Sequence, residues 1–155
     1  MRFRFIDRIV EFESGRRIVA VKAVTLAEDY LADHFPTFPV MPGVLMLQAL
    51  VEAAGWLVGE SRGFPSSGVL LREARNVTYK SFVKPGNLLR VEVACRRLAQ
   101  DESDFDGLGY RQDEEVIKAR FGLTHRGAGE LEGKAAERRT ESRSFPREEF
   151  ERLRG

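Results

Sequence analysis

The sequence predicts an α+β fold in which an antiparallel sheet wraps around one long, buried helix. The first observation is an apolar run from Val44 to Val58, which is long enough for a helix and apolar on almost every side. The second is a hairpin pattern before this run, at residues 2–25. The third is a series of strand-like segments after it, at residues 68–82, 88–98, 104–111 and 115–125. A single helix among so many strands is buried only if the sheet closes around it.

The hairpin and the helix each carry local signals of where they begin and turn. Ser14-Gly15 separates two apolar stretches within residues 2–25 and is typical of a turn between strands. Pro42 suits the first turn of the helix that follows. Gln48 and Glu52 are the two polar residues of the apolar run, and their spacing of four places them on one face. We expect this polar spot to be used, because unpaired polar groups are costly to bury.

Residues 126–155 differ in composition from the rest of the chain. They are rich in Arg, Glu, Gly and Ser and contain few apolar residues. We therefore expect a compact domain at residues 1–125, followed by a charged C-terminal tail at residues 126–155. The tail is expected to be flexible or loosely docked, with a short helix from Pro146 to Leu153.

The composition excludes several classes of function. With 155 residues, of which 43% are hydrophobic and 32% charged, the chain is expected to form one globular domain with a proper core. A formal net charge of +1 argues against bulk binding to nucleic acid or to an anionic membrane. Cys95 is the only cysteine, and His34 and His125 have no metal-binding spacing, so we expect neither a disulfide nor a metal.

The same sequence favours a cytoplasmic protein. Its first residues alternate polar and apolar side chains and lack the apolar region of a signal peptide. The longest apolar segment, Val44–Val58, contains Gln48 and Glu52 and is too short to span a bilayer.

The segment from His34 to Gly43, HFPTFPVMPG, is the most informative part of the chain. It combines a histidine with three prolines, and its glycine opens the apolar run of the helix. Such a segment holds a titratable imidazole at one end and a helix N-terminus at the other. Those are two of the groups that an enzyme needs to remove a proton from a carbon next to a carbonyl.

Together with the following VLMLQ, this segment resembles the signature of the β-hydroxyacyl-acyl carrier protein dehydratases, HFPGxPxMPGVLxxE. Residues 79–88, YKSFVKPGNL, are similar to a second motif of that family, FxxPVxPGDxL. The resemblance covers most of residues 1–125. It implies the hotdog fold, in which an antiparallel sheet wraps around one long central helix. It also implies a homodimer with active sites in tunnels between the subunits, often assembled as a trimer of dimers.

The implied reaction belongs to fatty-acid biosynthesis. A (3R)-3-hydroxyacyl thioester carried on acyl carrier protein loses water and becomes a trans-2-enoyl thioester, without a metal or an organic cofactor. The resemblance assigns His34 as the catalytic base, and an unperturbed pKa of about 6.5 leaves its imidazole largely neutral at pH 7. The alternative for His34 is a solvated loop histidine.

Gly43 matches the family's glycine whose backbone N–H binds the thioester carbonyl. A helix N-terminus offers free N–H groups and a positive dipole end, which favour an enolate oxyanion. Val44 would line the same spot. The alternative is that Gly43 serves only the turn after Pro42.

The chain departs from the family at the acid. The position fourteen residues after the histidine is normally Glu or Asp, and here it is Gln48, whereas Glu52 stands one turn later, where the family commonly has Gln. An amide cannot protonate a leaving hydroxyl. Glu52 leans toward Gln48 and could act through it or through a water, with a pKa raised by burial. The alternative is a structural carboxylate.

Further residues are candidates for the acyl tunnel, although such side chains are more often plain core. These are Phe38, Met46, Tyr79 and Phe82, with Trp56 beside them. Four basic residues are candidates for docking the acidic carrier protein or are simply solvated, namely Arg72, Arg75, Lys80 and Lys84. His125 and Cys95 are expected to be structural.

The sequence therefore predicts a hydro-lyase, a 3-hydroxyacyl-acyl carrier protein dehydratase. Because Gln48 replaces the usual acid, two alternatives stay open. One is a hotdog thioesterase or acyl-CoA hydratase. The other is a non-catalytic acyl-binding subunit that pairs with an active paralogue.

Overall fold

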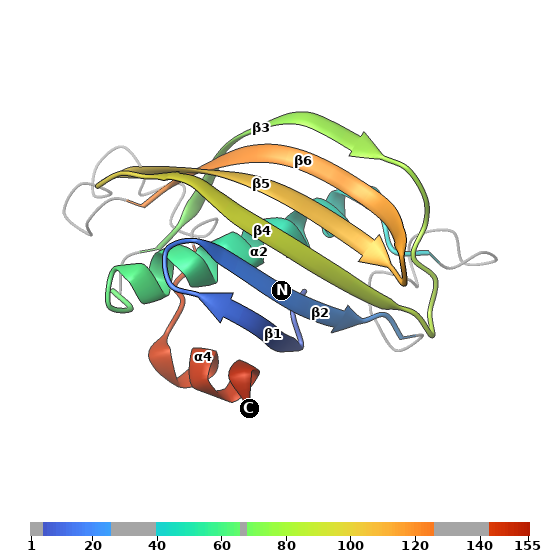
Figure 1. Cartoon of the computed structure of the whole chain (residues 1–155), viewed down its shortest axis with the longest axis horizontal. Helices are drawn as coiled ribbons and strands as arrows, with labels where there is room; N and C mark the ends of the chain where they lie inside the picture. The colour runs from blue at the N-terminus through green and yellow to red at the C-terminus, as the bar shows by residue number, and fades with distance from the viewer. Residues whose placement is uncertain (1–4, 26–39, 66–67, 126–142) are drawn as a thin grey trace.

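The structure is a computed structural model that describes residues 5–25, 40–65, 68–125 and 143–155. Within these residues six strands form one sheet in the order β1-β2-β4-β5-β6-β3, and every neighbouring pair is antiparallel. The strands are β1 (Arg8–Glu13), β2 (Arg17–Ala23), β3 (Leu70–Tyr79), β4 (Leu88–Leu98), β5 (Glu102–Arg111) and β6 (Glu114–Thr124). The helices are α2 (Gly43–Ser61) and α4 (Arg147–Arg154). Figure 1 shows the sheet curving over α2.

This arrangement confirms the predicted α+β fold. The hairpin expected at residues 2–25 is present as β1 and β2, with Gly15 at a φ of 70° in the turn. Only glycine adopts that backbone region at little cost. Of the later strands, β4 matches its predicted range, whereas β3 is shorter at both ends than the expected 68–82. The ends of β3 differ from the prediction because the pattern of apolar residues does not show where hydrogen bonding to the neighbouring strand stops.

The central helix α2 is the core of the molecule. It packs against β2, β4, β5 and β6, and its residues Leu50 and Trp56 are both fully buried. The helix begins one residue before the predicted Val44 and ends at Ser61, so it has 19 residues. By length and composition alone it is apolar enough to cross a membrane. Its burial under the sheet accounts for that composition, since a helix covered on most sides needs apolar residues all round.

The edge strand β3 presents apolar side chains to the surface. Its register against β6 shifts between Leu71 and Glu73 and again between Arg75 and Thr78. Leu71 and Tyr79 remain 40% and 48% exposed. Exposed apolar residues on an edge strand are typical of a surface that another chain covers.

Residues 143–155, which we call the C-terminal clasp, pack against the opposite side of α2 from β5 and beside β1 (Figure 1). The short helix expected from Pro146 to Leu153 is present as α4. Phe150 is buried and its ring meets Phe12 of β1 edge-on at 4.9 Å. Phe145 meets Trp56 in the same way at 4.8 Å. The division of the chain into two domains at residue 125 stays a prediction.

Candidate active site

Among the described residues, no side chain caps the N-terminus of α2. Pro42 caps the helix without any side-chain hydrogen bond, and the first turn contains no acidic residue. The backbone N–H groups of Gly43 and Val44 have no acceptor within the helix, because the first turn of any α-helix leaves its N–H groups unpaired. The positive end of the helix dipole is therefore not neutralised by the helix itself.

Gly43 is also required by packing. A Cβ atom at this position would lie 2.9 Å from the ring of Tyr79. The absence of a side chain thus lets the Tyr79 ring close against the start of α2. Met41 holds the preceding backbone in place, since its N–H donates to the carbonyl of Val83 at 2.8 Å.

The tunnel residues predicted from the sequence have different surroundings. Val44, Tyr79 and Phe82 are 64%, 48% and 56% exposed. Met46, by contrast, is fully buried in the hydrophobic core under the sheet. The two remaining candidates, His34 and Phe38, belong to a segment outside the residues that the structure describes. The apolar surface near the helix start therefore comes from Val44, Tyr79 and Phe82.

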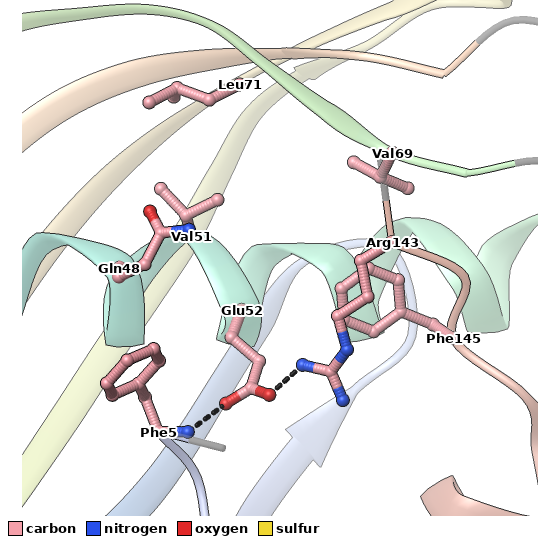
Figure 2. A pocket seen from close by; sticks show the side chains of 8 residues that line it. All are labelled: Phe5, Gln48, Val51, Glu52, Val69, Leu71, Arg143 and Phe145. Atoms are coloured by element: carbon pink, nitrogen blue, oxygen red, sulfur yellow. Dashed lines mark hydrogen bonds and ion pairs between the residues drawn. The ribbon is translucent and has the colours of Figure 1, made fainter. Parts of the chain in front are cut away.

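A cavity of about 120 Å³ lies along α2, one turn and more from its start. Its polar lining consists of Gln48, Glu52 and Arg143. Its apolar lining consists of Phe5, Val51, Val69, Leu71 and Phe145. Figure 2 shows the Gln48 side chain and the Glu52 carboxylate pointing in different directions from the same helix. Both residues nevertheless line the same cavity.

The Glu52 carboxylate is engaged at both oxygens. Its Oε2 accepts the backbone N–H of Phe5 at 2.8 Å, and its Oε1 forms an ion pair with Nη1 of Arg143 (Figure 2). The residue is only 6% exposed. A guanidinium and a backbone N–H both donate to the ionised form of a carboxylate and favour it.

Arg143 itself is held in several directions. Its Nη2 donates to Oε1 of Glu149 at 3.1 Å, and its guanidinium lies 4.7 Å from the centre of the Phe145 ring. Sequence reasoning missed Arg143, Phe145 and Phe5. The presence of Glu52 on a buried helix could have indicated that a basic residue lies beside it, because a buried carboxylate needs a cation nearby. Nothing local distinguishes Arg143 from the other arginines of the tail.

His125 lies at the other end of α2 and has structural contacts. It is 2% exposed, with Nε2 3.1 Å from the Ser103 hydroxyl and Nδ1 3.0 Å from the Arg62 guanidinium. Burial and the positive charge of Arg62 lower the pKa of this imidazole. Among the described residues no three His, Cys, Asp or Glu side chains are grouped to hold a metal ion.

Comparisons with known proteins agree with this geometry. The family model of the FabA-like domain matches residues 1–120. A 3-hydroxyacyl-[acyl-carrier-protein] dehydratase FabZ from Rhizorhabdus wittichii is 40% identical over 118 residues, which cover 75% of this chain and 75% of the relative. The chain belongs to the FabA-like dehydratase family. A FabZ dehydratase from Coxiella burnetii is 34% identical over 120 residues, 76% of this chain and 84% of that protein.

Solved structures share the hotdog fold of this FabA-like protein. The dehydratase heterocomplex ApeI:P from Xenorhabdus doucetiae has a TM-score of 0.68 at 14% identity and covers 83% of this chain and 86% of that one. A point mutant of the fluoroacetyl-CoA-specific thioesterase FlK has a TM-score of 0.65, also at 14% identity, and covers 83% and 98%. The same fold thus carries dehydratase and thioesterase names, so it does not decide between these activities.

The family match ends before the C-terminal clasp. It stops at residue 120, whereas Arg143 and Phe145 line the cavity from beyond that point. The part of the FabA-like protein that closes on Glu52 therefore lies outside the matched domain.

Proposed function

We propose that this chain is a (3R)-3-hydroxyacyl-acyl carrier protein dehydratase of fatty-acid biosynthesis, a hydro-lyase that forms trans-2-enoyl thioesters. The observation that carries the proposal is that α2 begins at Gly43 without a side-chain cap among the described residues and carries Gln48, about one turn later, in the lining of a cavity. The family's signature leads directly into this helix end, and the FabZ relatives carry the name of the same activity.

In the proposed reaction His34 removes the α-proton, and the N–H of Gly43 binds the thioester oxygen as negative charge develops on it. The bond between the β-carbon and its hydroxyl then breaks. With an amide at position 48, the proton that His34 has taken is the one that leaves with the hydroxyl as water. The neutral imidazole is regenerated, and the enzyme gains or loses no net proton. Gln48 holds the hydroxyl by a hydrogen bond while this happens.

Glu52 has a supporting role in this mechanism. Arg143 and the N–H of Phe5 favour its ionised form, which has no proton to give. Glu52 therefore holds Arg143 and Phe5 in the wall of the cavity, and His34 carries out the proton transfer.

The proposal includes a homodimer that meets acyl carrier protein in the cytoplasm. Val44, Tyr79 and Phe82 expose apolar surface around the start of α2, and Leu71 extends it along β3. A second copy of the chain would cover this surface, and three such dimers would form the larger assembly that the resemblance implies.

The test is a direct assay with 3-hydroxyacyl-acyl carrier protein, in which enoyl formation and free thiol are both measured. We expect enoyl product from the wild-type protein and a loss of at least about 100-fold in His34→Ala. Thiol release without an enoyl product would instead identify a hotdog thioesterase. Tight acyl binding without turnover would identify a non-catalytic subunit, which is the alternative that Gln48 favours.

A further inference from the structure

We infer that the C-terminal clasp forms the closed end of the acyl-binding cavity and limits the substrate to neutral acyl chains of about octanoyl length. This inference rests on the proposed function, because that function places an acyl chain in the cavity. It names a substrate class that the family membership does not specify.

The clasp is a fixed wall. Val69 and Arg143 exchange two backbone hydrogen bonds, of 2.8 and 3.2 Å, which tie the start of the clasp to the chain just before β3. The Phe145 side chain, 5% exposed, sits directly over Gly55 of α2. A Cβ atom on Gly55 would overlap the Phe145 ring, so the ring occupies space that only a glycine leaves.

The position of the clasp along α2 decides what it closes. Gln48, Glu52 and Gly55 follow one another on a single stripe of the helix, at spacings of four and three residues. The cavity begins at Gln48 and ends against Arg143 and Phe145 (Figure 2). A chain that enters past Gln48 therefore meets the clasp after one further turn of helix.

The volume of the cavity sets the length of the chain. In the proposed reaction Gln48 holds the hydroxyl of the third carbon, so the cavity receives the carbons beyond it. A cavity of about 150 Å³ accommodates a benzene ring of six carbons, and this one has about 120 Å³. It therefore accepts about five carbons, which together with the first three correspond to an octanoyl chain.

The charges at the clasp select against an anionic chain end. Arg143 already binds the carboxylates of Glu52 and Glu149. A carboxylate in the cavity would meet the carboxylate of Glu52, which lines it, and would also lose its hydration. The cavity thus suits a methyl-ended chain.

The clasp also explains the exchange of residue types on α2. A glutamine at position 52 would leave the Arg143 guanidinium without its most buried counter-charge. The carboxylate at position 52 and the clasp thus depend on each other, although only the clasp lies beyond the matched domain.

The experiment measures binding, so that it does not depend on turnover. Acyl-pantetheine analogues with an amide in place of the thioester, from butanoyl to tetradecanoyl, are titrated into the whole protein by calorimetry. For the wild type we expect the affinity to rise about fourfold per methylene up to octanoyl and then to stop rising. An ω-carboxyl analogue of octanoyl length is expected to bind at least about tenfold more weakly than octanoyl.

The variants Phe145→Ala and Phe145→Leu test the wall. Both are expected to move the limit to longer chains, by roughly two methylenes or more for alanine. If the alanine variant does not fold, the leucine variant decides. Phe150→Leu is the matched control, because Phe150 is equally buried in the clasp but does not line the cavity. Its length limit is expected to equal that of the wild type.

Some outcomes would overturn the inference. Affinity that keeps rising to tetradecanoyl in the wild type, an unchanged limit in folded Phe145→Leu, or an equal shift in Phe150→Leu would each do so. A wild-type limit at octanoyl in a protein that forms no enoyl product would support the wall while contradicting the dehydratase function. The two proposals therefore fail separately.

Discussion

The Glu52 carboxylate of α2 forms an ion pair with the Arg143 guanidinium of the C-terminal clasp, and its other oxygen accepts the N–H of Phe5. One buried carboxylate thus joins the N-terminal segment, the central helix and the clasp. Removing one partner of such a pair costs more than the pair contributes, because the remaining charge stays buried.

Arg143→Met is expected to lower the free energy of unfolding by about 3 kcal/mol, since it leaves Glu52 buried without its cation. Glu52→Gln is expected to cost about 1 kcal/mol, because the amide still accepts the N–H of Phe5 and Arg143 keeps Glu149. The double variant is expected to be more stable than Arg143→Met alone. Urea unfolding measures all three.

The control for this cycle is Glu114→Gln. It makes the same chemical change at an exposed ion pair, between Glu114 and Arg111 at 2.6 Å, and is expected to cost less than about 1 kcal/mol. Simple additivity of the Glu52 and Arg143 losses would mean that the two residues are not coupled.

Gly55→Ala is expected to destabilise the protein by about 1–3 kcal/mol, because the new methyl group overlaps the Phe145 ring. In a Phe145→Ala background the same substitution is expected to increase the free energy of unfolding instead of lowering it. Alanine then gains up to about 1 kcal/mol over glycine from helix propensity alone. Thermal or urea unfolding of the four proteins measures both effects. A cost that is the same in both backgrounds would show that the ring does not sit over Gly55.

Gln48→Glu is expected to raise kcat for dehydration by about 100-fold, because it supplies a proton donor at the position where the amide only orients the hydroxyl. Gln48→Asn is the matched control, since it keeps an amide and is expected to gain nothing. Single-turnover assays with an octanoyl-length 3-hydroxyacyl-acyl carrier protein measure the change. An unchanged kcat in Gln48→Glu would mean that proton donation to the hydroxyl does not limit the reaction.

The sequence was sufficient to predict those features that depend on one continuous segment of the chain. The apolar run after Pro42 predicted α2, because a helix that is buried on most sides has almost no polar face. The spacing of Gln48 and Glu52 predicted only that they share a face, and the structure adds that both line one cavity. The family signature before Gly43 identified the dehydratase family for the same reason, since it is one continuous segment.

The clasp could not be predicted in this way. Arg143 reaches Glu52 across most of the chain, and periodicity says nothing about contacts between distant segments. Phe145 and Phe150 are two aromatic residues in a charged tail, where a flexible segment was the simpler expectation. Their burial depends on Gly55 and on Phe12, whose surfaces take shape only when the fold is complete.

His125 predicts how stability depends on pH. Burial, followed by the charge of Arg62, lowers the pKa of its imidazole below the ordinary value of about 6.5. Below a pH of about 6.5 the unfolded chain is therefore protonated at His125 more readily than the folded protein. The contribution of His125 to the free energy of unfolding is fully present above that pH and decreases as the pH falls below it. Backbone hydrogen bonding and the negative charge of Asp101 oppose this shift, with smaller effects.

The test compares the wild type with His125→Gln between about pH 7.5 and about pH 5. The free energy of unfolding of the wild type is expected to fall more steeply with decreasing pH than that of the variant. His34 is present in both proteins, so it does not contribute to the difference between them. The variant keeps a side chain that can bond to Ser103, whose hydroxyl lies 3.1 Å from Nε2 of His125. Parallel pH profiles would mean that His125 is protonated equally well in the folded protein, in spite of its burial beside Arg62.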